Sequence, residues 1–119
     1  MNLKTYAVAF DSSDALDLAR FWSRALGRPV DPDGTPDFAS IGLTGDGSTA
    51  PRLLFAKVPE AKTVKNRVHL DLATDSLDEE VDRLLGLGAR KQDQHDEVGA
   101  RWVTLADPQG NEFDVIAGQ

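Results

Sequence analysis

Two stretches of this chain alternate polar and apolar side chains in the manner of half-buried β-strands. The first stretch covers residues 66–72, and the second lies at the end of residues 106–115. Because successive side chains of a strand point to opposite faces, His69 and Asp71 share one face of the first stretch, and Leu70 lies on the other. The pattern requires a sheet with one buried apolar face and one face that carries polar groups.

The second stretch repeats this division. Glu112 and Asp114 share one face, and Phe113 and Val115 share the opposite face. A sheet that buries its apolar face beneath helices can turn its carboxylates and imidazole toward a cavity. Because small-ligand pockets combine apolar walls with a few convergent polar groups, the two stretches predict a small-molecule site.

Apolar residues at helical spacing predict one helix in each half of the chain. The first covers about residues 14–26 and stops at Gly27, and the second begins near Leu77 and stops at Gly88. Ser76 begins a capping-box pattern at the start of the second helix. Each helix therefore has its own apolar stripe and its own sequence signals for its two ends.

The two halves share one order of expected elements, a strand, a helix and then two or three further strands. A single offset aligns Asp14 with Asp75 and Gly27 with Gly88. The strand before the second helix is expected over residues 67–73. We therefore predict one α+β domain over residues 1–119, with a first module at about 1–58, a linker at 59–65 and a second module at 66–119.

The charge balance limits the partners that the chain can have. Thirteen basic residues stand against twenty acidic ones, which gives a net charge of −7. Because nucleic-acid binding depends on clustered basic residues that neutralise phosphates, we expect no nucleic-acid partner and no binding to anionic membranes. The acidic balance favours cationic or neutral small molecules.

The chain contains no cysteine, which excludes disulfides and thiolate metal sites. No apolar run reaches the ~18 residues of a membrane-spanning helix, and residues 1–6 lack the apolar region of a signal peptide. A cytoplasmic protein is expected on these grounds.

Three segments of the chain carry a family resemblance. They are residues 14–27, 65–72 and 107–113, and their order and spacing cover nearly the whole sequence. Together they resemble the vicinal oxygen chelate superfamily, and in particular its glyoxalase-like and bleomycin-resistance-like proteins. The resemblance implies the glyoxalase/bleomycin-resistance/dioxygenase fold, in which two βαβββ modules curl mixed sheets around a cavity, usually within a homodimer.

The resemblance also implies a metal site, which this sequence fills only in part. His69 matches the histidine that begins the second module, and Asp114 matches the closing glutamate in a shortened form. The first module offers Ala7 or Val8 where a further ligand is expected, and neither can bind a metal. Imidazole and carboxylate suit Mn²⁺, Ni²⁺, Zn²⁺ or Fe²⁺, but catalytic sites normally have three protein ligands. This shortfall favours a protein without a bound metal.

Two functions compete on this basis. In the first, the protein binds a small organic molecule without a complete metal site, in a cavity lined by His69, Asp71, Trp102 and Thr104. In the second, it is a metal-dependent glyoxalase-type lyase or isomerase with His69 and Asp114 as metal ligands, and Asp114 or Glu112 moves a proton. A regulatory protein with a vestigial site is a third interpretation, so the sequence leaves open whether the protein is an enzyme.

Some of these side chains also have a purely structural interpretation. Trp102 can pack beneath a helix instead of lining the cavity, and Glu112 can pair with Arg67 or Arg101 across strands. His95 lies in a polar run and is expected to be a solvated loop residue.

Overall fold

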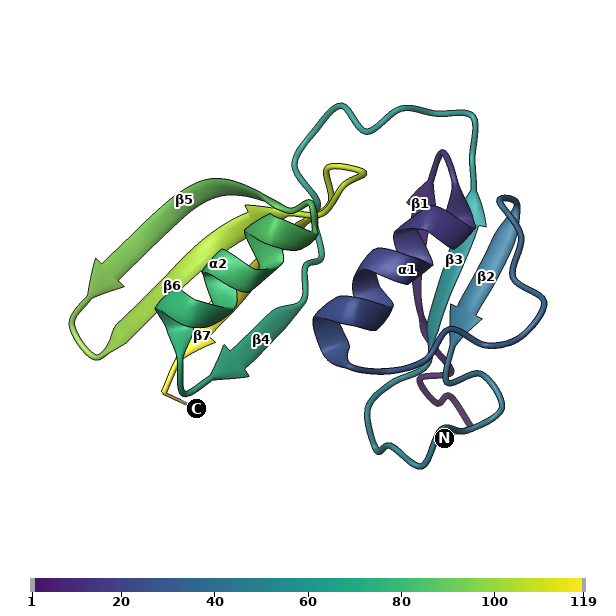
Figure 1. Ribbon diagram of the computed structural model, residues 1–119, viewed down its shortest axis with the longest axis horizontal. Coiled ribbons are helices and arrows are strands. Elements are labelled where there is room, and N and C mark those ends of the chain that lie inside the picture. The colour runs from purple at the N-terminus through teal and green to yellow at the C-terminus, as the bar shows by residue number, and fades with distance from the viewer. Residues whose placement is uncertain (1, 119) are drawn as a thin grey trace. The chain divides into compact units, whose positions relative to one another are not determined.

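The computed structural model describes residues 2–118 and divides the chain into two compact units, which meet between Ala61 and Lys62. Figure 1 shows one helix and one sheet in each unit. The boundary falls inside the linker expected from the sequence. Each unit is described by itself below, and neither helix of the described chain is long and apolar enough to span a bilayer.

The first unit contains a three-stranded sheet and one helix. Strand β3 lies in the centre, parallel to β1 and antiparallel to β2. The elements are, in chain order, β1 (Val8–Ser12), α1 (Ala15–Leu26), β2 (Phe38–Ile41) and β3 (Leu53–Lys57).

Helix α1 has the ends that the sequence predicts. The Asp14 carboxylate accepts a hydrogen bond from the Asp17 amide at 3.0 Å, which satisfies one free amide of the first turn. At the other end Gly27 adopts a φ of 66°, a left-handed conformation that glycine reaches without a steric penalty. The side chains of Leu18 and Trp22 are fully buried, so the predicted apolar stripe faces the core.

Aromatic rings join this helix to its sheet. The ring of Phe10 on β1 stacks on Phe55 of β3 with 5.2 Å between the centroids, and lies 5.3 Å from the Trp22 ring of α1. Phe10 and Phe55 therefore point toward the helix. Since side chains alternate along a strand, Ala9 and Leu54 point to the opposite face.

The second unit contains a four-stranded mixed sheet with one helix. Its strand order is β4-β7-β6-β5, with β4 parallel to β7 and the other two pairs antiparallel. The elements are β4 (Asp71–Thr74), α2 (Leu77–Leu87), β5 (Arg90–Glu97), β6 (Ala100–Ala106) and β7 (Glu112–Ala117).

The buried side of this sheet follows the predicted alternation. Val103 and Leu105 of β6 and Phe113 and Val115 of β7 are buried at alternate positions, and the helix presents its own apolar stripe of buried residues. The buried side chains of this core include Leu77, Val81, Leu84, Val103, Leu105, Phe113 and Val115. Since side chains alternate along a strand, Trp102, Thr104, Glu112 and Asp114 lie on the opposite face, directed away from α2.

Three local predictions for this unit are wrong. Strand β4 begins at Asp71, so His69 precedes the strand, and Val68 is 82% exposed instead of facing the core. Ser76 occupies the N-cap of α2 but its side chain makes no capping hydrogen bond, so the predicted capping box does not form. His95 lies within β5 and not in a loop.

The two units share one βαβββ plan, with one strand reduced in the first. Val30 forms an isolated antiparallel bridge with Ile41 of β2, and the Asp31 amide donates to the Ser40 carbonyl at 2.9 Å. This short segment stands beside β2 as β5 stands beside β6 in the second unit. The predicted α+β fold class is therefore confirmed, with a fourth strand of the first module shortened to a single bridge.

The turn between β6 and β7 fixes the start of the last strand. The Gly110 amide donates to the Asp107 carbonyl at 2.8 Å, as the predicted type I turn requires. The Asp107 carboxylate is fully buried and accepts hydrogen bonds from the amides of Gln109 and Asn111 at 2.9 and 3.0 Å. These contacts set the register in which β7 presents its carboxylates.

Candidate functional site

Three predicted site residues meet at the edge of the second sheet. The His69 Nδ1 atom lies 2.9 Å from Asp71 Oδ1 and 3.8 Å from Asp114 Oδ2. Parallel pairing of β4 and β7 places Asp71 opposite Asp114, and the Asp114 amide donates to the Leu70 carbonyl at 2.9 Å. One donor atom from each of the three side chains lies within 4.8 Å of the others. We call His69, Asp71 and Asp114 the acidic triad.

Thr104 fixes one member of this triad. It lies opposite Asp114 across β6 and β7, and its hydroxyl donates to Asp114 Oδ1 at 2.6 Å. The other carboxylate oxygen of Asp114 is the one nearest His69. Thr104 therefore orients the carboxylate toward the imidazole.

Trp102 continues the same face, two residues before Thr104 on β6. It is partly exposed, and its ring stacks on His95 of the neighbouring strand, with centroids 4.7 Å apart and planes inclined by 21°. His95 Nε2 lies 3.3 Å from Asp93 Oδ2. Because the alternate residues Val103 and Leu105 are buried on the helix side, Trp102 does not pack beneath α2. His95 is a neighbour that the sequence reasoning missed.

Glu112 is held by partners other than those expected. Its carboxylate accepts a hydrogen bond from the Asn66 amide at 3.0 Å and forms an ion pair with Lys62 at 3.1 Å. Burial raises the pKa of Glu112, but these two contacts outweigh that effect and leave the pKa below its ordinary value. Arg101 pairs with Asp78 instead, at 2.5 Å. Glu112 thus ties the segment before β4 to β7.

The first unit has no equivalent of the acidic triad. Strands β1, β3 and β2 of the first unit pair in the same way as β4, β7 and β6 of the second. The residues at the matching positions are Ala9, Leu54 and Ser40, in place of Asp71, Asp114 and Thr104. Two of these three side chains are apolar, so this face of the first unit offers no imidazole or carboxylate at the matching positions.

The acidic triad fits a divalent cation. One imidazole nitrogen and two carboxylate oxygens suit Mn²⁺, Fe²⁺, Ni²⁺ or Zn²⁺, and three protein ligands leave positions open for a substrate. Asp71 would supply the third ligand that the sequence count lacked. The sequence pattern predicts that Asp71 lies beside His69 and binds a ligand, but it does not predict a metal-binding role for Asp71. The pairing of Asp71 with Asp114 depends on the parallel register of β4 and β7, which the sequence does not show.

A family model for the glyoxalase-like domain matches residues 7–116. The chain belongs to the glyoxalase-like domain family. The resemblance to the vicinal oxygen chelate superfamily and the predicted fold are thereby confirmed. A search of curated proteins gives no match to this glyoxalase-like chain.

Solved structures show the same fold at low identity. A glyoxalase/bleomycin resistance protein/dioxygenase family enzyme from Burkholderia phytofirmans has a TM-score of 0.77 and 15% identity, over 97% of this glyoxalase-like chain and 98% of that one. A mutant of the fosfomycin resistance protein FosX from Listeria monocytogenes, complexed with Mn(II) and 1S,2S-dihydroxypropylphosphonic acid, has a TM-score of 0.77 and 13% identity, over 100% and 93%. A bleomycin-binding protein from Streptomyces verticillus, complexed with copper(II)-bleomycin, has a TM-score of 0.64 and 18% identity, over 100% and 99%.

Proposed function

We propose that this chain binds a small organic molecule on the face of the second sheet that points away from α2. The observation that carries the proposal is the continuity of this face. Asp71, Asp114 and Thr104 lie on the adjacent strands β4, β7 and β6, with His69 just before β4, and the stacked rings of Trp102 and His95 follow on β6 and β5. Convergent polar groups beside an aromatic surface are the usual composition of a small-ligand site.

The chemistry of the face indicates the class of ligand. A planar group can stack on the exposed part of Trp102, and a cationic group gains additional attraction from its ring. The carboxylates of Asp71 and Asp114 accept hydrogen bonds and favour positive charge, in agreement with a net charge of −7. Cationic aromatic compounds are therefore the first ligands to test. One protein of the same fold, from Streptomyces verticillus, binds bleomycin, which supports such a role.

The test is a calorimetric screen of cationic aromatic compounds in the presence of a chelator. With any compound that binds, Trp102→Ala should weaken affinity about threefold or more, because aromatic pairs contribute about 0.5 to 1.5 kcal/mol beyond surface burial. Tyr6→Ala is the matched control, since Tyr6 is an exposed aromatic of the first unit. Equal losses in the two variants, or no loss in either, would show that the face is not the binding site.

A second candidate function is a metal-dependent lyase or isomerase, and the acidic triad favours it. A divalent metal held there would polarise vicinal oxygens of a substrate. Thr104 would keep Asp114 oriented, and Glu112 or Asp114 would accept or return a proton. The FosX structure with the same fold contains Mn(II), which supports a metal in this fold, although 13% identity carries only the fold itself.

Metal content separates the two candidates. Untagged protein is soaked with Mn²⁺, Ni²⁺, Zn²⁺ or Fe²⁺, desalted and analysed by mass spectrometry. The enzyme hypothesis expects about one retained metal per chain in the parent protein and in His95→Ala, and none in His69→Ala. The chain has two histidines, so this pair of variants is a matched comparison. Retention that is absent, or equal in both variants, would rule out the metal site.

Association into a homodimer is also proposed, from the resemblance alone. Light scattering after size-exclusion chromatography gives the mass directly, against 12.9 kDa for one chain. A monomer at all concentrations would remove this part of the proposal.

A further inference from the structure

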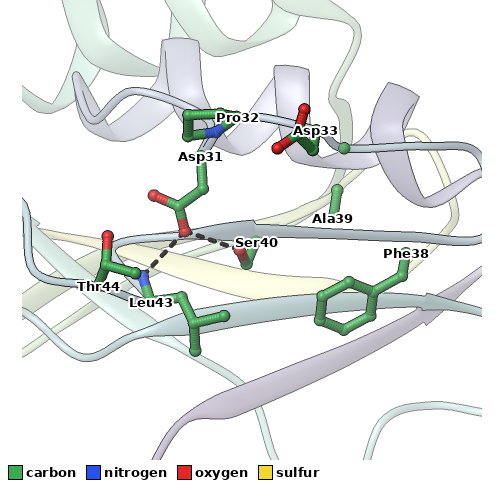
Figure 2. Close-up of a pocket in the computed structure, with 9 residues that line it drawn as sticks. Asp31, Pro32, Asp33, Phe38, Ala39, Ser40, Leu43 and Thr44 are labelled. Carbon is green, nitrogen blue, oxygen red and sulfur yellow. Dashed lines mark hydrogen bonds between the residues drawn. The ribbon is translucent and has the colours of Figure 1, made fainter.

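The first unit contains a pocket that the proposed function does not use. Its volume is about 380 Å³, and it lies between the segment around Asp31–Gly34, strand β2 and the loop that follows it. Figure 2 shows Asp31 and Asp33 on one side, with Phe38 and Leu43 on the other. Ligand pockets range from about 300 to 1,000 Å³, so this one suits a small molecule.

A carboxylate is fixed at one end of the pocket. Asp31 accepts hydrogen bonds from the Ser40 hydroxyl at 2.7 Å and from the amides of Leu43 and Gly42 at 2.9 and 3.3 Å. All three donors are neutral, so they orient the carboxylate without compensating its charge. Figure 2 shows the bonds to Ser40 and Leu43.

The pocket has a second carboxylate and no basic partner for either. Within residues 2–118, no lysine, arginine or histidine forms an ion pair with Asp31 or Asp33. Elsewhere in the same unit Asp46 is neutralised by Arg28 at 2.9 Å. The pocket therefore combines two negative charges that remain available to a ligand.

The backbone holds Asp33 in an unusual conformation. Its φ is 69°, the one positive φ of a non-glycine residue in the part of the chain that the structure describes. Such conformations cost free energy and persist where the surrounding structure requires them, often at ligand sites.

The remaining walls are apolar. Phe38 is a large hydrophobic residue left 45% exposed at the start of β2, and Pro32, Ala39 and Leu43 also line the space. An aromatic face attracts cations within about 6 Å of the ring centre. Carboxylates opposite an exposed aromatic ring match an organic cation better than Ca²⁺ or Mg²⁺, which bind through oxygen ligands and make no use of the ring.

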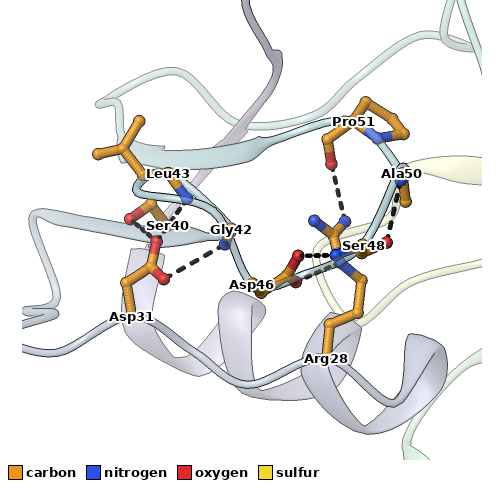
Figure 3. A network of polar contacts seen from close by, with 9 residues as sticks. All are labelled: Arg28, Asp31, Ser40, Gly42, Leu43, Asp46, Ser48, Ala50 and Pro51. Carbon is orange, nitrogen blue, oxygen red and sulfur yellow. Dashed lines mark hydrogen bonds and ion pairs between the residues drawn. The ribbon is translucent and has the colours of Figure 1, made fainter.

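The loop that closes the pocket is fixed from outside. Arg28 is 9% exposed and donates to Asp46 at 2.9 Å and to the Pro51 carbonyl at 2.7 Å, as Figure 3 shows. These contacts hold the middle and the end of the segment between Gly42 and Pro51. Leu43 and Thr44 line the pocket at its start, where the amides of Gly42 and Leu43 donate to Asp31.

We propose that this pocket is a second binding site, specific for a small organic ammonium ion. The cationic nitrogen lies between the Asp31 and Asp33 carboxylates and the Phe38 ring, and the alkyl groups contact the apolar walls. The site lies within the first unit and includes none of the residues of the acidic triad. Its test is therefore independent of the test of the proposed function.

The test is a titration followed by two-dimensional amide NMR with choline, and with its neutral isostere 3,3-dimethylbutan-1-ol. We expect saturable shifts for the amides around Asp31 and Thr44 with choline, and none or at least tenfold weaker binding with the alcohol. Phe38→Ala should weaken choline binding about threefold, the range measured for exposed cation–π contacts, and Asp33→Asn should weaken it through the lost charge. Asparagine tolerates a positive φ, so Asp33→Asn preserves the backbone.

The control is Asp37→Asn, which removes an equal charge from an exposed residue outside the pocket. It should leave choline binding unchanged. Equal weakening by Asp37→Asn, equal binding of the alcohol, or no saturable shifts in a folded protein would each overturn the proposal. Displacement of the same shifts by Ca²⁺ or Mg²⁺ alone, with no effect of Phe38→Ala, would identify a metal site and also overturn it.

Discussion

Replacing Gly42 by alanine tests whether Arg28 fixes the loop of the first unit. Gly42 has a φ of 71°, and an added Cβ would lie 2.4 Å from Arg28 Nη2. No real Cβ contact is that short, so the guanidinium must move. Because Arg28 is nearly buried and donates to the Pro51 carbonyl at 2.7 Å, it cannot move without losing this hydrogen bond.

The expected cost has two parts. A left-handed conformation costs an alanine about 1 to 2 kcal/mol relative to glycine. Loss of a hydrogen bond made by a charged group costs about 1.5 to 3 kcal/mol. Gly47→Ala is the matched control, since Gly47 has a φ of 79° in the same loop and an added Cβ meets nothing within 4 Å. The control should show the first part alone.

The assay is urea unfolding followed by tryptophan fluorescence. In a Trp102→Phe background, Trp22 is the one tryptophan left in the chain, and it reports on the core of the first unit. Gly42→Ala should lower the unfolding free energy by about 1.5 to 3 kcal/mol more than Gly47→Ala. If both variants lose the same free energy, Arg28 does not hold the loop in the way described.

Three further predictions concern the second unit. Leu105→Ala leaves a cavity at a fully buried position beneath α2. It should lower the unfolding free energy, measured by urea unfolding, by about 2 to 5 kcal/mol. Asp107→Ala leaves two amides of its own turn without their acceptor and should cost about 1 to 3 kcal/mol in the same assay. The lowered pKa of Glu112 means that its contacts with Lys62 and the Asn66 amide stabilise the fold above the ordinary value of 4.5, and that this stabilisation is lost as the pH falls through the folded-state pKa. Glu112→Gln should therefore flatten the decline of stability below that pH, and an unchanged acid profile would contradict the ion pair's role.

The elements that the sequence predicts correctly are those whose signals lie within a few neighbouring residues. Both helices end at the predicted glycines, Gly27 and Gly88, and the alternation along β7 places Phe113 in the core and Asp114 on the other face. The turn at Asp107 also forms as expected, because its side chain and Gly110 carry the turn geometry themselves.

Features that depend on partners distant in the sequence were not predictable in this way. The strand before α2 starts only at Asp71, where pairing with β7 begins, so His69 reaches the triad from outside the sheet. The polar neighbours of His95 predict a loop, yet β5 pairs with β6, with one irregularity between Lys91 and Asp93, and stacks His95 on Trp102. Edge strands exposed on both faces lack the apolar alternation by which strands are recognised.

The two units share a fold but carry different side chains at matching positions. At matching positions the second unit carries Asp71, Asp114 and Thr104, where the first carries Ala9, Leu54 and Ser40. The first unit instead gathers unpaired carboxylates beside β2, where its fourth strand is reduced to the bridge at Val30. A full strand in that place would occupy the backbone groups of β2 and leave less room for the loop that ends at Asp33. The pocket of the first unit thus lies where the second unit has the paired strands β5 and β6.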